Sequence, residues 1–113
     1  ILAFGGGGSQ TQPGLGGFKI SLDALEGLRR QWAIELGEHG IRVVTLKTGG
    51  ILESIADPVE REKIRPLIEP GTLLKRTATL ADVGNVAAFV ASDHARTITS
   101  TEINISCGAI VDG

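Results

Sequence analysis

The chain has 113 residues, a formal net charge of −2, and 42% hydrophobic against 21% charged residues. A chain of this length and composition buries one hydrophobic core but not two. Its near-neutral charge gives no electrostatic reason to expect nucleic acid or an anionic membrane as a partner, and no apolar run approaches the ~20 residues of a membrane-spanning helix. The single cysteine, Cys107, cannot form an internal disulfide, which favours a reducing, cytoplasmic location.

The first residues, Ile1 to Phe4, form a short apolar run typical of a strand that is covered on both faces. Because the sequence has no methionine and no lead-in before this strand, we expect it to be the internal to carboxyl-terminal piece of a longer protein. A processed terminus is the alternative. A glycine-rich loop follows, from Gly5 to Gly14. Its glycines would let a phosphate approach closely, but they lack the spacing of a phosphate-binding fingerprint, so a plain loop is the preferred interpretation.

The residues from Leu15 to Gly37 predict one long amphipathic helix. Its apolar stripe is made of Phe18, Leu22, Leu25, Trp32 and Leu36, widened by Ala24, Leu28 and Ala33. The polar side chains of the other face are Lys19, Asp23, Glu26, Arg29, Arg30 and Glu35. Glu26 and Arg30 are four residues apart in the favourable order for an ion pair. We expect this polar face to be either solvated or a polar partner surface.

The β-branched run from Gly40 to Leu46 predicts the next buried strand, so that strand, helix and strand form a right-handed βαβ unit. Residues 52–78 are polar and punctuated by prolines, and a capping box beginning at Asp57 predicts a short helix over roughly residues 58–65. A second capping signature at Thr79 opens a helix that ends near Ser92. Residues 102–105 predict the last strand.

The remaining candidate ligands and nucleophiles are few. His39 and His94 lie far apart on loop-like segments, without a carboxylate or thiol at ligand spacing, so we expect no metal site. Cys107 is interpreted as a small packing residue because no base is spaced to serve it.

The pattern Phe18-x-x-Ser21-Leu22, followed by small and apolar residues, resembles the active-site helix of the short-chain dehydrogenase/reductases, which carry Tyr-x-x-x-Lys there. The resemblance continues through the stretch from Gly40 to Val43 and through the last helix and strand. It implies the carboxyl-terminal part of a doubly wound, Rossmann-like parallel α/β sheet. The resemblance implies that residues 1–113 supply three strands with flanking helices and that the amino-terminal cofactor-binding half is absent. It also implies that residues 52–78 are a substrate lid, while a connecting surface segment with solvated charges is the alternative.

The resemblance also implies a site, although the family's catalytic residues are replaced. Phe18 stands for the tyrosine, Leu22 for the lysine, and Gly5 for a serine that holds the substrate oxygen; Ser9 would replace that serine only with a shorter loop. No catalytic residue is therefore assigned, and the chain has no tyrosine. Cofactor contacts are implied at a turn that replaces Pro-Gly-x-Ile, formed by Thr48, Gly49, Gly50 and Ile51.

Two further replacements fall near the implied cofactor. Val44 takes the place of an asparagine, and Glu53 takes the place of a threonine that commonly reaches the cofactor phosphate. A carboxylate at that position would repel a phosphate.

Three functions stay open at this stage. The first is a divergent oxidoreductase that transfers hydride between NAD or NADP and a small carbonyl or alcohol. The second is a catalytically silent dinucleotide-binding sensor or oligomer partner, and the third is a purely structural interaction module. The implied partners are a small-molecule substrate and a second copy that pairs through the helix over residues 17–37, with no nucleic acid and no membrane.

Overall fold

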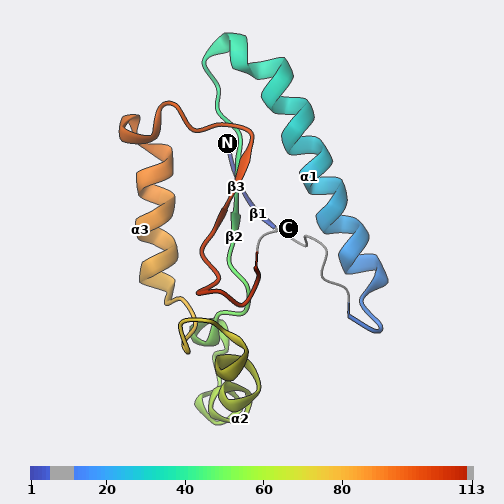
Figure 1. The fold of residues 1–113 in the computed structure, drawn as a ribbon, viewed down its shortest axis with the longest axis vertical. Coiled ribbons are helices and arrows are strands. Elements are labelled where there is room, and N and C mark those ends of the chain that lie inside the picture. Colours follow the sequence, from blue (N-terminus) through green and yellow to red (C-terminus); the bar gives the residue numbers. More distant parts are fainter. Residues whose placement is uncertain (6–11, 112–113) are drawn as a thin grey trace.

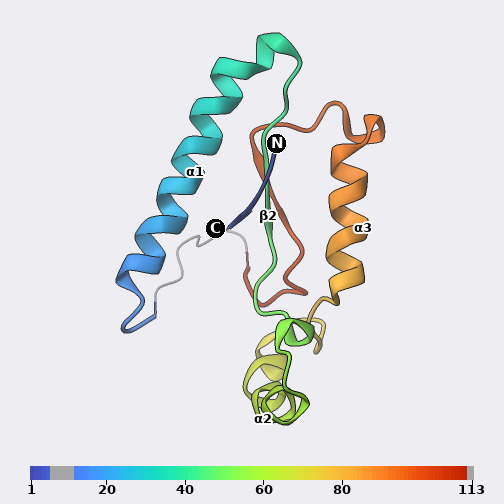
Figure 2. The ribbon, with the colours of Figure 1, turned by 180° about the vertical axis from the view of Figure 1, so that it is seen from behind.

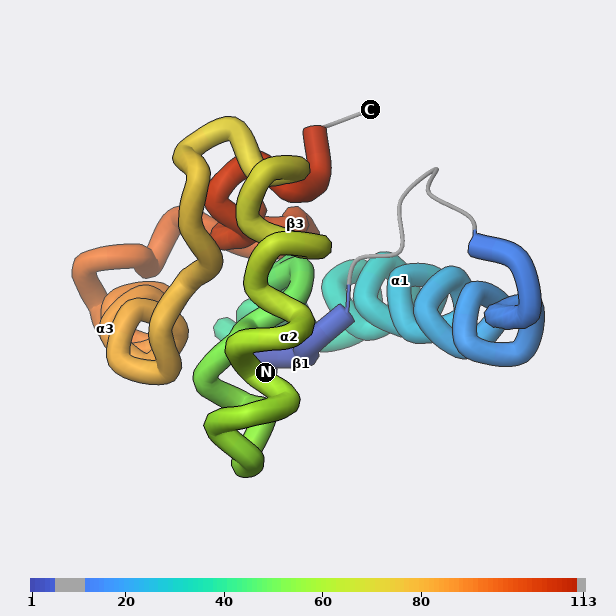
Figure 3. Tube along the Cα trace, turned by 90° about the horizontal axis from the view of Figure 1, so that it is seen from below, coloured from blue at the N-terminus to red at the C-terminus, as the bar shows by residue number. Residues whose placement is uncertain are grey.

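The structure is a computed structural model that describes residues 1–5 and 12–111. A parallel sheet in the order β1-β2-β3 is formed by β1 (Leu2–Gly5), β2 (Val44–Lys47) and β3 (Thr101–Asn104). Helices α1 (Gly16–Leu36) and α3 (Leu80–Ala91) lie on opposite sides of this sheet (Figures 1 and 2). Helix α2 (Pro58–Ile68) lies beyond the carboxyl ends of the strands (Figure 3). Short 3-10 helices span Gly37–His39, Leu52–Ser54, Glu69–Gly71 and Asp93–Ala95.

The hydrophobic core lies between the sheet and α3. Val44 and Leu46 of β2 pack with Val90 of α3, and all three are at most 1% exposed. Successive strand residues point to opposite faces, so these two β2 side chains define the face that α3 covers. The core side of the sheet is therefore an ordinary apolar layer.

Both ends of α3 are fixed by side chains. At its start, Thr79 and Asp82 form the expected capping box, with N–H···O distances of 2.9 Å in both directions. At its end, the guanidinium of Arg42 donates to the carbonyl oxygens of Val90 and Ser92, at 2.8 and 3.2 Å. A cation at a helix carboxyl end satisfies free carbonyls and interacts favourably with the helix dipole.

The side of the sheet that faces α1 is polar. Thr45 and Lys47 of β2, 0% and 5% exposed, point to this side, because they alternate with the core residues. The buried residues of α1 are Glu26 and Arg29. Arg29 Nε donates to Glu26 Oε2 at 2.5 Å, and Lys47 Nζ lies 2.5 Å from Glu102 Oε2 of β3. We call these four residues the charge cluster.

Of the two expectations for the polar face of the long helix, a solvated face or a polar partner surface, the first is wrong at Glu26 and Arg29, which are buried against the sheet. The helix meets the sheet through a stripe that contains these two residues together with the half-buried Leu22, Leu25 and Leu36. Because that stripe is rotated from the expected one, Phe18, Leu28 and Trp32 are exposed. Glu26 pairs with Arg29 instead of the expected Arg30.

The other elements fall close to their expected places. Helices α1 and α3 begin and end within one or two residues of expectation, whereas β2 begins at Val44 rather than at Gly40. Helix α2 continues to Ile68, past Pro66, beyond its expected end near residue 65. A proline near the end of a helix removes only one backbone hydrogen bond, and Arg65 bridges Glu62 and Glu69 across this stretch at 3.0 and 2.6 Å. Within residues 1–5 and 12–111, no helix has the length and apolar character that crossing a membrane demands.

Candidate functional site

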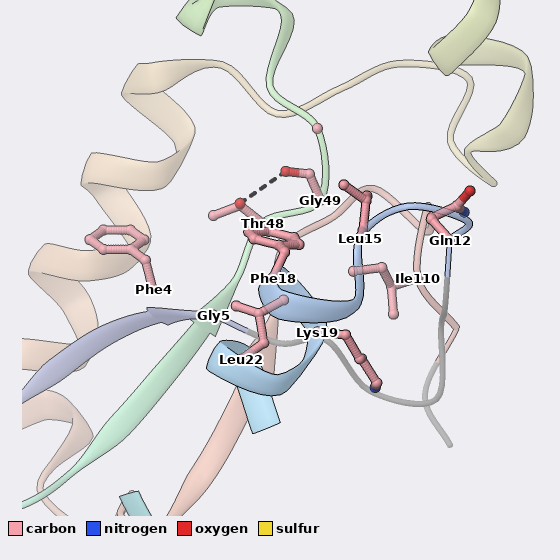
Figure 4. A pocket seen from close by; sticks show the side chains of 11 residues that line it. Phe4, Gly5, Gln12, Leu15, Phe18, Lys19, Leu22, Thr48, Gly49 and Ile110 are labelled. Carbon is pink, nitrogen blue, oxygen red and sulfur yellow. Dashed lines mark hydrogen bonds between the residues drawn. The ribbon is translucent and has the colours of Figure 1, made fainter. Parts of the chain in front are cut away.

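A pocket of about 490 Å³ opens at the carboxyl edge of the sheet, beside the first turns of α1 (Figure 4). Strand β1, the turn after β2, the start of α1 and the turn after β3 all contribute to it. Its lining residues are Phe4, Gly5, Gln12, Leu15, Phe18, Lys19, Leu22, Thr48, Gly49, Gly50 and Ile110. The carboxyl edge of a parallel sheet is where ligands bind in open α/β folds.

Helix α1 supplies an apolar wall. Phe18 and Leu22, one turn apart, both line the pocket, and the Phe18 ring is 61% exposed. The hydroxyl of the neighbouring Ser21 donates back to the Gly17 carbonyl oxygen at 2.9 Å, within the helix. Lys19 is the charged residue among those that line the pocket, and its Nζ lies 3.3 Å from Oδ1 of Asp23. At positions 18 and 22 this wall has neither the hydroxyl nor the ammonium group of a Tyr-x-x-x-Lys pair.

The turn after β2 forms the floor at Thr48, Gly49 and Gly50. Gly49 has φ +65°, and a Cβ atom there would lie 3.0 Å from Cβ of Ser106, so this position requires glycine. The Thr48 hydroxyl donates to the Gly49 carbonyl oxygen at 3.0 Å. Three of the four expected cofactor contacts thus line the pocket, while Ile51 does not.

The turn after β3 closes the pocket at Ile110, a contribution that the sequence reasoning missed. The Asn104 amide donates to the Ile110 carbonyl oxygen at 2.7 Å, and the Ser106 hydroxyl donates to Asn104 Oδ1 at 2.6 Å and accepts from the Ile110 N–H at 3.1 Å. This network holds Ile110, which is 9% exposed, against the pocket. The signal in the sequence was an Asn and a Ser, short side chains that bond to nearby backbone, just before a glycine turn.

The replaced positions have structural roles. Val44 lies in the α3-side core, on the opposite face of the sheet from α1. Glu53 Oε2 accepts a hydrogen bond of 2.9 Å from the backbone N–H of Leu80, the first residue of α3. A carboxylate at a helix start is favourable, so the acid at this position has a local explanation. Gly5 lines the pocket, and Ser9 lies outside the described residues.

The charge cluster joins the helix of the pocket wall to the sheet: Glu26 and Arg29 lie on α1, and Lys47 and Glu102 lie on β2 and β3. Burial raises the pKa of Glu102, but the hydrogen bond and charge of Lys47, with smaller contributions from Glu26 and Arg29, outweigh burial and hold that pKa below its ordinary value. Lys47 and Glu102 were not expected as a pair. The sequence did contain a signal for this pair. Val44 and Leu46 alternate with Thr45 and Lys47 along a buried strand, which places the Lys47 charge on the face of the sheet opposite the apolar core.

The other candidates remain peripheral. His39 is exposed beside Glu38, at 3.4 Å, and Cys107 is half-buried in the turn after β3 with φ 56°. Among the described residues, no three histidine, cysteine or acidic side chains are grouped so as to hold a metal ion.

Three parallel strands between two helices, with a pocket at their carboxyl edge, define part of a Rossmann-like α/β fold. Residues 6–109 match the sequence model of the enoyl-(acyl carrier protein) reductase family. The chain is 37% identical over 86 residues to the NADH-dependent enoyl-[acyl-carrier-protein] reductase of Haemophilus influenzae, covering 75% of this chain and 33% of that protein. An oxidoreductase of Sarocladium schorii is 32% identical over 108 residues, covering 96% of this chain and 43% of that protein.

Solved structures agree. A 4-hydroxyisoleucine dehydrogenase complexed with NADH superposes with a TM-score of 0.84 at 26% identity, over 96% of this chain and 46% of that one. The enoyl-(acyl-carrier-protein) reductase of Anaplasma phagocytophilum in complex with NAD gives 0.82 at 27% identity, over 100% and 42%. The chain belongs to the short-chain dehydrogenase/reductase family. The chain spans between a third and a half of the length of the Haemophilus influenzae and Sarocladium schorii relatives.

Proposed function

We propose that the protein containing this chain is a divergent oxidoreductase that transfers hydride between NAD or NADP and a small carbonyl or alcohol substrate. The observation that carries the proposal is the pocket at the carboxyl edge of the sheet, with its glycine floor at Gly49 and its apolar wall. A flat nicotinamide ring needs a close backbone approach on one side and an apolar surface on the other. The NAD and NADH complexes of the similar structures support the same cofactor class.

Neither Phe18 nor Leu22, which stand at the positions of the family's tyrosine and lysine, can donate a proton, and this bears on the class of substrate. Hydride transfer to a simple ketone creates an alkoxide, a strong base that needs a proton close by. Hydride transfer to the β-carbon of a conjugated enoyl carbonyl creates an enolate instead, and solvent can protonate its α-carbon afterwards. Because Phe18 and Leu22 supply no proton and no charge, we favour a conjugated enoyl substrate. The enoyl reductase names of several relatives support this choice.

The same two residues favour a second candidate, a protein that binds the dinucleotide without turning it over. In that case the pocket serves as a sensor. We also infer that α1 pairs with a second copy through residues 17–37, since it exposes apolar side chains there, among them Ile20 at 70% and Ile34 at 81%.

Calorimetric titration of the natural full-length protein with NADH and NADPH tests the site. We expect Gly50→Leu, which adds a side chain at a lining position of ordinary backbone geometry, where a Cβ atom would lie 3.5 Å from Cδ1 of Ile68, to weaken nucleotide binding at least about tenfold, a change of about 1.4 kcal/mol. Gly71→Leu is the matched control, because Gly71 does not line the pocket and a Cβ atom there would meet nothing within 4 Å. If neither nucleotide binds, the proposal fails. Binding with consumption of NADH on a short enoyl thioester supports the oxidoreductase, and binding without consumption of any substrate supports the sensor.

A further inference from the structure

Lys19 brings a positive charge to the apolar wall of the pocket. It lies on α1 four residues after Leu15 and three before Leu22, and all three residues line the pocket. Residues at these spacings share one side of a helix. The Lys19 side chain is 22% exposed, and Figure 4 shows it extending from α1 away from Phe4. A lysine stem is long and flexible and packs along apolar surface, so the ammonium group can reach a ligand that fills the pocket.

The other polar side chains of the pocket carry no charge. Among the described residues that line it, these side chains are Gln12 and Thr48. The Thr48 hydroxyl already donates to the Gly49 carbonyl oxygen at 3.0 Å, and Gln12 is exposed. Within this set of lining residues, a negatively charged ligand group therefore finds its opposite charge at Lys19. The attraction between the two charges is stronger beside apolar side chains than in open water, because the effective dielectric constant is lower there.

The local sequence of α1 disfavours a cation at this position. Lys19 is the fourth residue of the helix, and the first turn of α1 contains no acidic residue. A cation near the amino end of a helix is unfavourable because the helix dipole is positive there. The ion pair with Asp23 has the lysine before the acid, which is the weaker order at this spacing, and the Asp23 side chain is 58% exposed. A ligand carboxylate can therefore take the place of Asp23 at small cost.

We propose that the pocket binds a small amphiphilic carboxylate, with the carboxylate paired to Lys19 and the apolar chain packed against Phe18 and Leu22. One ammonium group balances one negative charge, and a carboxylate is the group that Asp23 already presents to this lysine. The pocket volume of about 490 Å³ is within the range of small-ligand sites. That the bound carboxylate belongs to the enoyl substrate rests on the proposed function, whereas the binding itself does not.

Hexanoate and its uncharged amide, hexanamide, test the proposal when they are titrated into the natural full-length protein without nucleotide. The two probes share an apolar chain and differ in charge. We expect hexanoate to bind at least about tenfold more tightly than hexanamide. Lys19→Met keeps an apolar stem and should remove this difference, whereas Lys19→Arg should retain it. Lys63→Met is the matched control, because Lys63 also pairs with an acid on its own helix, Glu60 at 3.5 Å, and does not line the pocket.

Asp23→Asn should have an effect of the opposite sign, which a variant that merely unfolds cannot produce. It removes the carboxylate that competes for Lys19, so hexanoate should bind about threefold more tightly while the affinity for hexanamide stays the same. Hexanoate affinity that is unchanged or lower in Asp23→Asn overturns the proposal. So does a wild type that binds neither probe or binds both equally, and so does a difference that survives Lys19→Met. These titrations involve no nucleotide and no turnover, so failure of the proposed function leaves the carboxylate site standing, and the reverse also holds.

Discussion

Removal of the buried lysine should destabilise the protein strongly. Lys47 Nζ and Glu102 Oε2 lie 2.5 Å apart, and their side chains are 6% and 22% exposed. Lys47→Met leaves the Glu102 carboxylate without its cation, behind the helix that forms the pocket wall. Breaking a buried ion pair from one side costs about 3–5 kcal/mol. We expect about 3 kcal/mol here, because Glu102 keeps some contact with solvent.

Removal of both partners should cost far less. In Lys47→Met with Glu102→Leu, no charge is left unpaired, since Glu26 and Arg29 still neutralise each other at 2.5 Å. Replacing a buried ion pair by apolar side chains of similar volume is often neutral or stabilising, so we expect the double variant to be within about 1 kcal/mol of the wild type. Urea denaturation of the single and double variants gives the pairwise coupling free energy. A single variant within about 0.5 kcal/mol of the wild type, the range of an ordinary surface substitution, refutes this reasoning. So does a double variant that is less stable than the single one.

The same pair gives a pH dependence with a defined sign. Burial alone would raise the pKa of Glu102, but the hydrogen bond and charge of Lys47, together with Glu26 and Arg29, outweigh burial, so the folded-state pKa lies below the unfolded one. A lowered carboxyl pKa stabilises the folded state above the unfolded pKa, and this stabilisation is lost as pH falls through the folded-state value. The deficit of Lys47→Met relative to the wild type should therefore shrink in acid. A deficit that stays constant from neutral pH down to about pH 3 contradicts the assignment.

Three further outcomes are expected. Gly49→Ala should destabilise by about 1–2 kcal/mol in thermal or urea unfolding, because an L-residue at φ +65° is strained; unchanged stability would show that the turn relaxes. Expressed alone, residues 1–113 should aggregate or pair in size-exclusion chromatography, since β1 pairs only with β2 among the described strands and Phe4 is 60% exposed; a monodisperse, cooperatively melting monomer contradicts this. Phe18→Tyr with Leu22→Lys should not install strong ketone reduction in single-turnover assays of the full-length protein.

Much of the fold could be predicted because its signals are local. The capping box at Thr79 and the apolar spacing after it specify α3, and the β-branched run specifies β2. The orientation of α1 could not be predicted in this way. Periodicity says which residues share a face, but whether that face is buried depends on the surface opposite it. Glu26 and Arg29 are buried because the sheet presents charged partners, Lys47 and Glu102, to this side of the helix. Those two residues come from strands that are distant in the sequence.

The candidate site was predictable to the same degree. The turn at Thr48 and Gly49 and the wall at Phe18 and Leu22 follow from motif order along the chain, and all four line the pocket. Ile110 could not be placed, because its position depends on side-chain hydrogen bonds within the turn after β3. From sequence, Glu53 was expected to repel a cofactor phosphate. Its partner in the structure is the backbone N–H of Leu80 at the start of α3, an element distant in the sequence that local motifs do not place beside it.

The charge cluster also explains why the Tyr and Lys substitutions should fail together. The lysine introduced by Leu22→Lys would lie one helical turn before Glu26, about 6 Å along the axis, on the stripe of α1 that faces the sheet. Oε1 of Glu26 has no partner among the described residues, so the new ammonium would be attracted to that carboxylate. An ammonium held by Glu26 cannot also lower the pKa of a tyrosine at position 18, whose ordinary value is about 10. Adding Glu26→Gln to the two substitutions should therefore raise the ketone reduction rate per folded molecule, with the folded fraction measured separately because Arg29 loses its buried partner. No increase in a folded triple variant would show that Glu26 is not the competitor.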